Sequence, residues 1–297
     1  MQFRMGYMRG RTIDVGFVSS YAPPMRRNEF LGLLLGGGMT AGASSCATGT
    51  AATTGTAAAA GAPVPPRSGA RRVIRGICFD LFTLFDPRSV VQVAQTVVPE
   101  RAAELCETWR TRQFQYSWLR ASGGQYQDFR AVTWEALIYA ARAQQLTLSE
   151  AQSETLVEAY SQLQPWPDTR AALEAFRRSG LRLATLANYS PRMISVLLQH
   201  GGLSELFDAQ ISTDAARTYK PDPRAYALGV STLGLAREEI AFSAFGGWDS
   251  AGARWFGYPT FWVNRLGVAA EELGPGPDAS GPTLTELAAF VSSWATG

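Results

Sequence analysis

The chain has 297 residues, of which 46% are hydrophobic and 18% charged, and a formal net charge of +2, which is typical of a globular protein with a sizeable core. Six arginines but only two acidic residues lie in residues 1–70, so the rest of the sequence is slightly acidic. A nucleic-acid-binding domain usually carries a basic patch or stripe, so we expect small-molecule partners and no nucleic acid.

Residues 1–46 have the features of an export signal. Arg26-Arg27 precede a short apolar run that glycines interrupt, and small residues then lead to Cys46. Paired arginines before a weakly hydrophobic run resemble a twin-arginine signal, which implies a periplasmic protein, with an upstream extension if translation starts at Met25. A low-complexity tail without an export role is the alternative interpretation of the same composition.

Two processing sites are compatible with this leader. Cys46 after small residues resembles a lipoprotein cleavage site and would give a membrane-anchored lipoprotein. The small residues at 41–43 offer an ordinary signal cleavage site and would give a soluble product. Residues 47–70 are rich in Ala, Gly, Thr, Ser and Pro without periodic apolar positions, which predicts a low-complexity linker.

Short apolar runs in the remaining sequence predict buried strands, and helical patterns lie between most of them. Strands that alternate with helices favour an α/β fold, with a Rossmann-like parallel sheet covered by helices on both faces. The predicted strands are 73–79, 181–187, 208–212, 240–245 and 259–263, and the predicted helices of the core are 168–179, 191–200 and 223–233.

About a hundred residues without a strand signal separate the first two predicted strands. Residues 87–165 are helical by pattern, with amphipathic periods in 113–119, 129–141 and 149–163. We therefore expect a core made of residues 71–86 and 166–297, interrupted by a helical cap domain. A helical insertion after the first strand would cover the carboxyl ends of the strands, where open α/β sheets bind their ligands.

Asp80 directly follows the first predicted strand, so its carboxylate stands where a buried strand ends. A helix or turn cap is the ordinary role of an aspartate there. A carboxylate nucleophile instead needs a nearby cation to stay ionised, and Lys220, the only lysine in the sequence, is the obvious candidate.

Five segments resemble the motifs of the haloacid dehalogenase superfamily, especially the type II 2-haloacid dehalogenases. The resemblance covers about residues 73–275, in chain order and at fitting distances. The matching segments are DLFTLFD at 80–86, WRTRQFQYSWLR at 109–120, Asn188 after LATLA, YKPDPRAY at 219–226 and GWDSAGA at 247–253.

The resemblance implies covalent catalysis on a small 2-haloacid or related carboxylate, through an aspartyl ester to a 2-hydroxy acid. It implies no metal and no cofactor, and it makes a homodimer the expected assembly. The implied catalytic residues are Asp80, Arg110, Lys220 and Asp249. The implied substrate-binding residues are Thr83, Phe82, Asn188, Tyr226, Trp248, Phe114 and Phe129.

Several positions depart from the family pattern. Phe82 stands where the superfamily's phosphatases have a second aspartate, which favours reaction at carbon over phosphoryl transfer. The loop after Asp80 is one residue short, so Thr83 is shifted. Residues with small side chains replace hydroxyl and amide residues at Ala187, Ala244 and Gly246.

Three other functions stay open. Another leaving group at carbon, such as in the ring opening of a cyclic amino acid, would use the same nucleophile. A phosphatase would require magnesium, and a non-catalytic periplasmic binding protein would have kept only the fold.

Overall fold

The computed structural model describes residues 73–296. The predicted export signal (1–46) and linker (47–70) lie outside the described residues. Within the described part of the chain, none of the helices is both long and apolar enough to cross a membrane.

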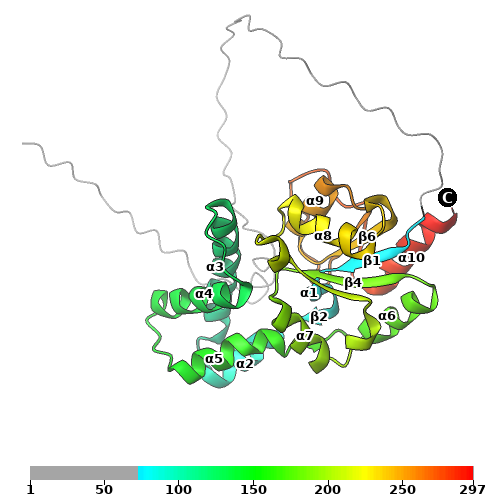
Figure 1. Cartoon of the computed structure of the whole chain (residues 1–297). Helices are drawn as coiled ribbons and strands as arrows, with labels where there is room; N and C mark the ends of the chain where they lie inside the picture. Colours follow the sequence, from blue (N-terminus) through cyan, green and yellow to red (C-terminus); the bar gives the residue numbers. More distant parts are fainter. Residues whose placement is uncertain (1–72, 297) are drawn as a thin grey trace, which may run out of the picture.

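A six-stranded parallel sheet forms the centre of the molecule, in the order β5-β4-β1-β6-β7-β8 (Figure 1). This arrangement confirms the predicted α/β fold with a parallel sheet. The strands are β1 (Gly76–Phe79), β4 (Arg182–Ala187), β5 (Ala209–Ser212), β6 (Ile240–Ala244), β7 (Thr260–Val263) and β8 (Ala279–Gly281).

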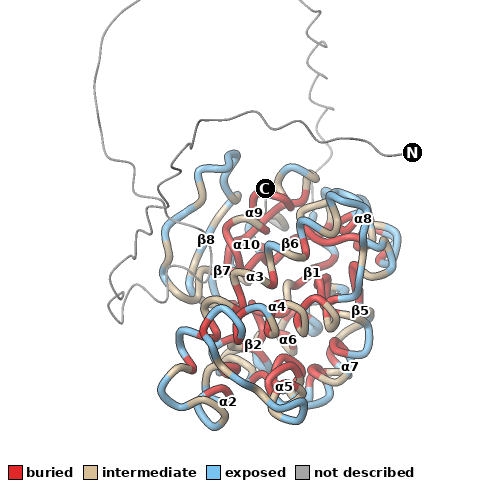
Figure 2. The backbone as a smooth tube through the Cα atoms, turned by 90° about the vertical axis from the view of Figure 1, so that its left-hand side faces the viewer, coloured by how far each residue is buried: buried red, intermediate tan, exposed pale blue. Residues whose placement is uncertain are grey.

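Helices pack on both faces of the sheet because its central strands are apolar on both sides. In β1, Ile77 and Phe79 join one hydrophobic cluster, while Cys78 between them joins a second cluster on the opposite face. The first face is covered by α6 (Thr169–Arg178), α7 (Pro191–His200) and α10 (Leu284–Thr296), and the second by α8 (Pro223–Leu233) and α9 (Gly247–Phe256). Figure 2 shows the central strands mainly buried and the loops exposed.

Four helices leave the core between β1 and β4 and lie together on one side of the molecule (Figure 1). Their ends are set by local signals, such as the capping box between Ser149 and Gln152 at the start of α5. The helices are α2 (Ser89–Val97), α3 (Ala102–Ser122), α4 (Phe129–Ala143) and α5 (Glu150–Glu158), followed by the 3-10 turn η1 (Ala159–Ser161).

The segment between β1 and β4 contains two short strands, although its sequence showed no strand signal. Two-residue strands, β2 (Phe85–Asp86) and β3 (Gln164–Pro165), pair antiparallel where the chain leaves the core and returns to it. Strands this short carry no alternating pattern, so periodicity could not reveal them. They fasten both ends of the helical insertion at one point.

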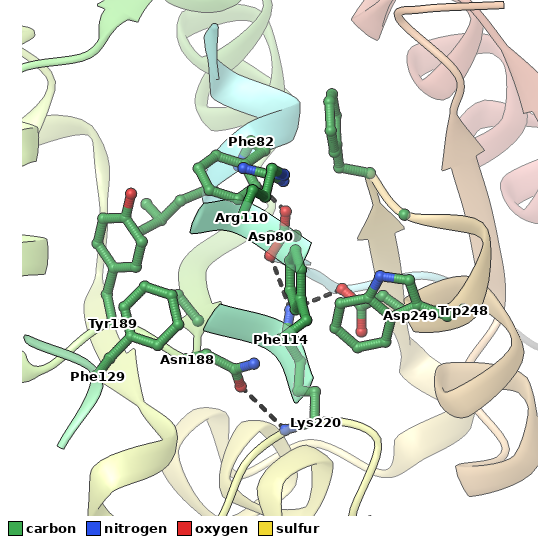
Figure 3. Close-up of a pocket in the computed structure, with 14 residues that line it drawn as sticks. Asp80, Phe82, Arg110, Phe114, Phe129, Asn188, Tyr189, Lys220, Trp248 and Asp249 are labelled. Atoms are coloured by element: carbon green, nitrogen blue, oxygen red, sulfur yellow. Dashed lines mark hydrogen bonds and ion pairs between the residues drawn. The ribbon is translucent and has the colours of Figure 1, made fainter. Parts of the chain in front are cut away.

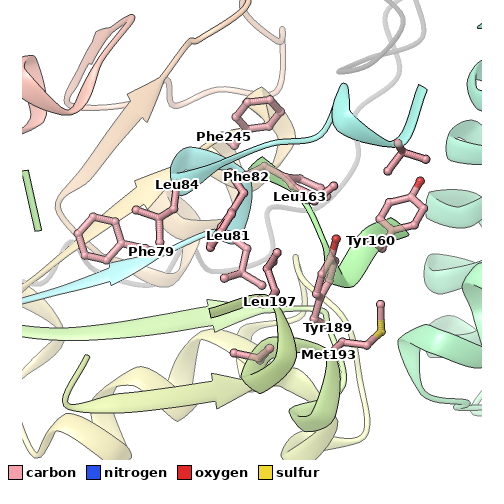
Figure 4. Packing of buried hydrophobic residues seen from close by; sticks show 14 of the residues in the cluster. Phe79, Leu81, Phe82, Leu84, Tyr160, Leu163, Tyr189, Met193, Leu197 and Phe245 are labelled. Atoms are coloured by element: carbon pink, nitrogen blue, oxygen red, sulfur yellow. The ribbon is translucent and has the colours of Figure 1, made fainter. Parts of the chain in front are cut away.

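The core is continuous with the cap helices through buried side chains at this junction. Figure 4 shows Leu81, Phe82 and Leu84 of the short helix α1 (Leu81–Leu84) packed near Leu163 and Leu197. The same cluster reaches residues of α3 and α4. The segment that follows Asp80 is therefore held by packing from both core and cap.

Candidate active site

Asp80 lies between the end of β1 and the start of α1, at the carboxyl edge of the sheet. Its side chain caps α1, because Oδ2 accepts a hydrogen bond from the Phe82 amide at 3.1 Å. The Thr83 hydroxyl donates to the Asp80 carbonyl oxygen at 2.7 Å, and the Asp80 amide donates to Ser243 of β6. The capping role and the placement at the strand end thus occur together.

Lys220 bridges two carboxylates at the floor of the site (Figure 3). Its ammonium Nζ lies 2.8 Å from Oδ1 of Asp80 and 2.6 Å from Oδ2 of Asp249, and its side chain is only 1% exposed. The Lys220 amide donates to Oδ1 of Asn188 at 2.9 Å, which ties the lysine loop to the end of β4. Loops after β1, β4 and β5 and the start of α9 therefore converge on one charged cluster.

The electrostatics of this cluster follow from burial. The pKa of Asp249 is raised to about 6, mainly because burial disfavours the charged carboxylate. The ammonium of Lys220 lowers this pKa, and the nearby Asp80 carboxylate raises it. Burial lowers the pKa of Lys220, but the two carboxylates outweigh it and the net direction is upward, so the lysine stays protonated. Two carboxylates with one ammonium leave an excess negative charge at the floor.

Tyr226 supports Asp249 from beneath. Its hydroxyl donates to Oδ1 of Asp249 at 2.7 Å, and the phenol is fully buried. Burial holds the pKa of Tyr226 well above its ordinary value, so the phenol remains a neutral hydrogen-bond donor.

Arg110 reaches the site from α3 of the cap, opposite Lys220 (Figure 3). Its guanidinium carbon lies 4.6 Å from the ring centroid of Phe82 and 5.1 Å from that of Phe114. The side chain is buried, and within residues 73–296 its Nε atom has no hydrogen-bond partner. A buried cation held by aromatic faces in this way is suited to bind an anion.

These residues line one cavity. Aromatic rings form much of its wall: Phe129 stacks on Tyr189 with ring centroids 5.1 Å apart, and Phe82 contacts Phe245 at 5.7 Å. Charged groups surrounded by apolar walls interact more strongly than in water. The lining residues are Asp80, Leu81, Phe82, Arg110, Phe114, Phe129, Ala187, Asn188, Tyr189, Lys220, Phe245, Gly246, Trp248 and Asp249.

The structure brings most of the predicted site residues into this cavity. The four predicted catalytic residues, Asp80, Arg110, Lys220 and Asp249, all line it. So do five of the predicted substrate-binding residues: Phe82, Asn188, Trp248, Phe114 and Phe129.

Thr83 and Tyr226 do not line the cavity, so the prediction that they bind substrate has to be corrected. Thr83 is fully buried, and its hydroxyl donates to the backbone carbonyl oxygen of Asp80. Tyr226 lies beneath Asp249 on α8 and contacts it rather than the cavity. Thr83 thus holds the backbone of Asp80, and Tyr226 holds the carboxylate of Asp249.

Tyr189, which follows Asn188 directly, was not among the predicted site residues. Its ring lines the cavity, and its buried hydroxyl has no hydrogen-bond partner in the described part of the chain. Its place just beyond the end of β4 was the signal that could have identified it, because ligands of parallel sheets bind at that edge.

The structure explains why position 246 is a glycine. A Cβ atom at this position would lie 2.7 Å from Nε1 of Trp248, so the indole occupies the space of a side chain. Ala187 also lines the cavity, whereas Ala244 packs in the hydrophobic cluster beneath α8 and α9. Two of the three departures from the family pattern therefore lie in the cavity wall.

The groups at the floor suit an ammonium better than a divalent cation. The two carboxylates are already bridged by Lys220, and the side chains of their neighbours Phe82 and Trp248 carry no oxygen. Among the described residues, no group of three or more His, Cys, Asp or Glu could hold a metal ion.

Comparison with known proteins identifies the family. A family model described as haloacid dehalogenase-like hydrolase matches residues 74–257. The chain is 41% identical over 224 residues to an (S)-2-haloacid dehalogenase of Pseudomonas sp. (strain YL), and the match covers 75% of this chain and 95% of that protein. It is 39% identical over 220 residues to haloacetate dehalogenase H-2 of Moraxella sp. (strain B), covering 74% and 98%.

A solved structure shares the same architecture. The L-2-haloacid dehalogenase of Xanthobacter autotrophicus, with chloropropionic acid covalently bound, matches with a TM-score of 0.71 and 33% identity, over 74% of this chain and 99% of that chain. The fold, the converging carboxylates and these similarities agree, and the chain therefore belongs to the haloacid dehalogenase-like hydrolases.

Proposed function

We propose that this protein hydrolyses small 2-haloalkanoic acids to 2-hydroxy acids through an ester on Asp80. The observation that carries the proposal is the Asp80–Lys220–Asp249 cluster at the floor of an aromatic cavity, with Arg110 opposite. The similarity to enzymes named 2-haloacid dehalogenases, one of them solved with chloropropionic acid covalently bound, supports the same chemistry.

In the first step, a carboxylate oxygen of Asp80 attacks C2 of the substrate. A carbon–oxygen bond forms, the carbon–halogen bond breaks, and the halide leaves with the bonding electron pair. Lys220 keeps the Asp80 carboxylate ionised before attack, since an ammonium 2.8 Å away favours the charged form. Arg110 provides the positive charge for the substrate carboxylate or the departing halide.

In the second step, water hydrolyses the ester. Water attacks the acyl carbon of the Asp80 ester, and the bond between that carbon and the substrate oxygen breaks. The 2-hydroxy acid leaves, the Asp80 carboxylate is restored, and one proton is released to solvent. Asp249 and Lys220 set the charge around this water, and Asn188 presents its amide at the same wall. The net reaction consumes one water and yields one halide and one proton.

Halide release from 2-chloropropionate tests the proposal. We expect the wild type to release chloride equally well with and without EDTA, and Asp80→Asn to lose activity by at least about 1000-fold, because the nucleophile is gone. Asp86→Asn is the matched control, since this carboxylate pairs with Arg88 outside the cavity. Loss of activity with EDTA, or full activity in Asp80→Asn, would exclude this mechanism.

A different leaving group is a specific alternative, because two residues of the cavity wall, Ala187 and Gly246, depart from the family pattern. The same Asp80 attack at carbon would open a strained ring of a cyclic amino acid. A panel that includes 2-haloacids and cyclic amino acids separates these substrates, because only the former release halide.

We also propose that the protein is exported to the periplasm and that it forms a homodimer. Arg26-Arg27 before the apolar run support twin-arginine export, and Cys46 after small residues supports a lipid-anchored form. Light scattering on the purified protein measures the assembly, with twice the chain mass expected for the dimer.

A further inference from the structure

A second hollow lies beside the active-site cavity. It is an open groove, and Trp248 lines both the groove and the cavity. The other lining residues are Trp118, Ala121, Ser122, Tyr219, Pro221, Asp222, Trp255 and Leu273.

The groove gathers exposed hydrophobic side chains. Trp118 is 37% exposed, Trp255 53% and Leu273 44%, and these are three of the six large hydrophobic residues exposed in the described part of the chain. Clustered exposed apolar side chains around a hollow usually mark a binding surface, whereas single ones do not.

The polar groups at the groove are mostly engaged elsewhere. The indole N–H groups of Trp118 and Trp255 donate to the carbonyl oxygens of Lys220 and Gly274, at 3.1 and 3.0 Å. The Asp222 carboxylate caps α8 and pairs with Arg224 at 2.6 Å. The groove is therefore suited to an apolar group.

Three aromatic rings lie where the two hollows meet. Phe114 lines the cavity, Trp118 lines the groove, and Trp248 contacts both rings, with centroid distances of 5.4 and 5.5 Å. Trp118 also fixes the position of Lys220 through its backbone. A molecule whose reacting end lies at Asp80 would meet the groove directly beyond Trp248.

We propose that the groove binds the hydrophobic tail of the substrate, so that the enzyme favours 2-haloacids with an extended alkyl or aryl chain. This inference rests on the proposed function, because it extends the substrate held at Asp80. The carboxylate and C2 stay in the charged cavity, while the tail passes Trp248 and packs against Trp255 and Leu273. Each pair of buried methylene groups improves binding roughly tenfold.

The test compares kcat/KM for 2-chloropropionate and 2-chlorooctanoate in four proteins: the wild type, Leu273→Glu, Trp255→Ala and Leu119→Glu. Leu119 is 66% exposed on α3 and does not line the groove, so it is the matched control for the leucine change. We expect the wild type to favour the longer acid by at least about tenfold. Both groove variants should lose about tenfold on the longer acid only, and Leu119→Glu should resemble the wild type.

The short substrate also reports on folding, since a misfolded variant would lose activity on both acids. Halide release from 2-chloropropionate with no preference for the longer acid, or with no effect of the groove variants, would overturn the groove inference alone. A change in oligomeric state caused by Leu273→Glu would assign the groove to a second copy of the chain and overturn it as well. No halide from either acid would overturn the proposed function itself.

Discussion

Lys220 shares its charge between two carboxylates of different exposure. The Asp249 side chain is only 1% exposed, while the Asp80 side chain is 14% exposed. Asp249 accepts hydrogen bonds from both Lys220 and Tyr226, so both of its carboxylate oxygens are engaged and it holds the ammonium in place. The more exposed carboxylate is left to react.

The pH profile of kcat/KM tests this division. When Asp249 is protonated, the Lys220 ammonium pairs with Asp80 alone. We therefore expect activity above the Asp249 pKa of about 6 and a fall in activity as the pH drops through that value. Tyr226→Phe removes a donor that lowers this pKa, so we expect the acid limb to move upward by about one pH unit.

Tyr258→Phe is the matched control for that change. Its hydroxyl donates to the Tyr226 carbonyl oxygen and does not contact Asp249, so its profile should keep the wild-type limb. A Tyr226→Phe profile that coincides with the wild-type profile would show that Asp249 does not control the limb.

At the scale of elements, α8 approaches the sheet closely at Gly229. A Cβ atom here would meet the Tyr258 hydroxyl, Sγ of Cys78 at 3.0 Å and Cδ1 of Leu186 at 3.2 Å. Alanine favours a helix over glycine by about 1 kcal/mol, but overpacking a core costs about 1–3 kcal/mol. The contacts come from fully buried side chains with little room to move aside, so the packing cost should be the larger effect.

We therefore expect Gly229→Ala to reduce the free energy of unfolding by about 1–2 kcal/mol, measured by denaturant titration. Ser231→Ala lies on the exposed face of the same helix and should change it by no more than about 0.5 kcal/mol. Equal stability of the two variants would mean that α8 can move away from β4.

The sequence predicts some elements to the residue and others poorly, for local reasons. The bounds 191–200 and 223–233 coincide with α7 and α8, because each begins with proline and is followed by glycine. The strand predicted at 73–79 begins only at Gly76, where pairing with Arg182 and Ile240 starts. The edge strand β8 was not predicted, because its small residues Ala-Ser-Gly depend on pairing with β7.

The site was predictable where it depends on strand ends and motif order. Asp80, Lys220 and Asp249 meet because parallel strands bring their carboxyl ends to one edge. Tyr189 and the burial of Thr83 were not predictable, since they depend on how the cap and the loop after Asp80 pack. The groove also needed the structure, because its residues come from distant segments.

At the scale of the whole molecule, the cap and the core are joined by side chains as well as by the β2–β3 pair. Tyr126 of the α3–α4 loop donates to Asp214 at 2.7 Å, and Trp118 of α3 donates to the lysine loop. Arg110 can face Asp80 only when the cap is seated on the core. The active site therefore depends on the folded arrangement of both parts.

The proposed export signal is tested on the same whole chain. Replacing Arg26 and Arg27 with lysine should reduce the periplasmic fraction of the protein at least about tenfold, since the arginine pair defines a twin-arginine signal. The matched control replaces Arg71 and Arg72, a second arginine pair close to the folded region. Immunoblots of cell fractions provide the measurement, and equal export of both variants would refute this signal.

The central claim is that a carboxylate oxygen of Asp80 becomes the hydroxyl oxygen of the product. A single turnover in H₂¹⁸O, with enzyme in excess over 2-chloropropionate, tests it by mass spectrometry of the product and of the peptide that contains Asp80. We predict unlabelled lactate and one ¹⁸O atom in Asp80, because water attacks the acyl carbon of the ester. Labelled lactate with an unlabelled Asp80 would contradict the account.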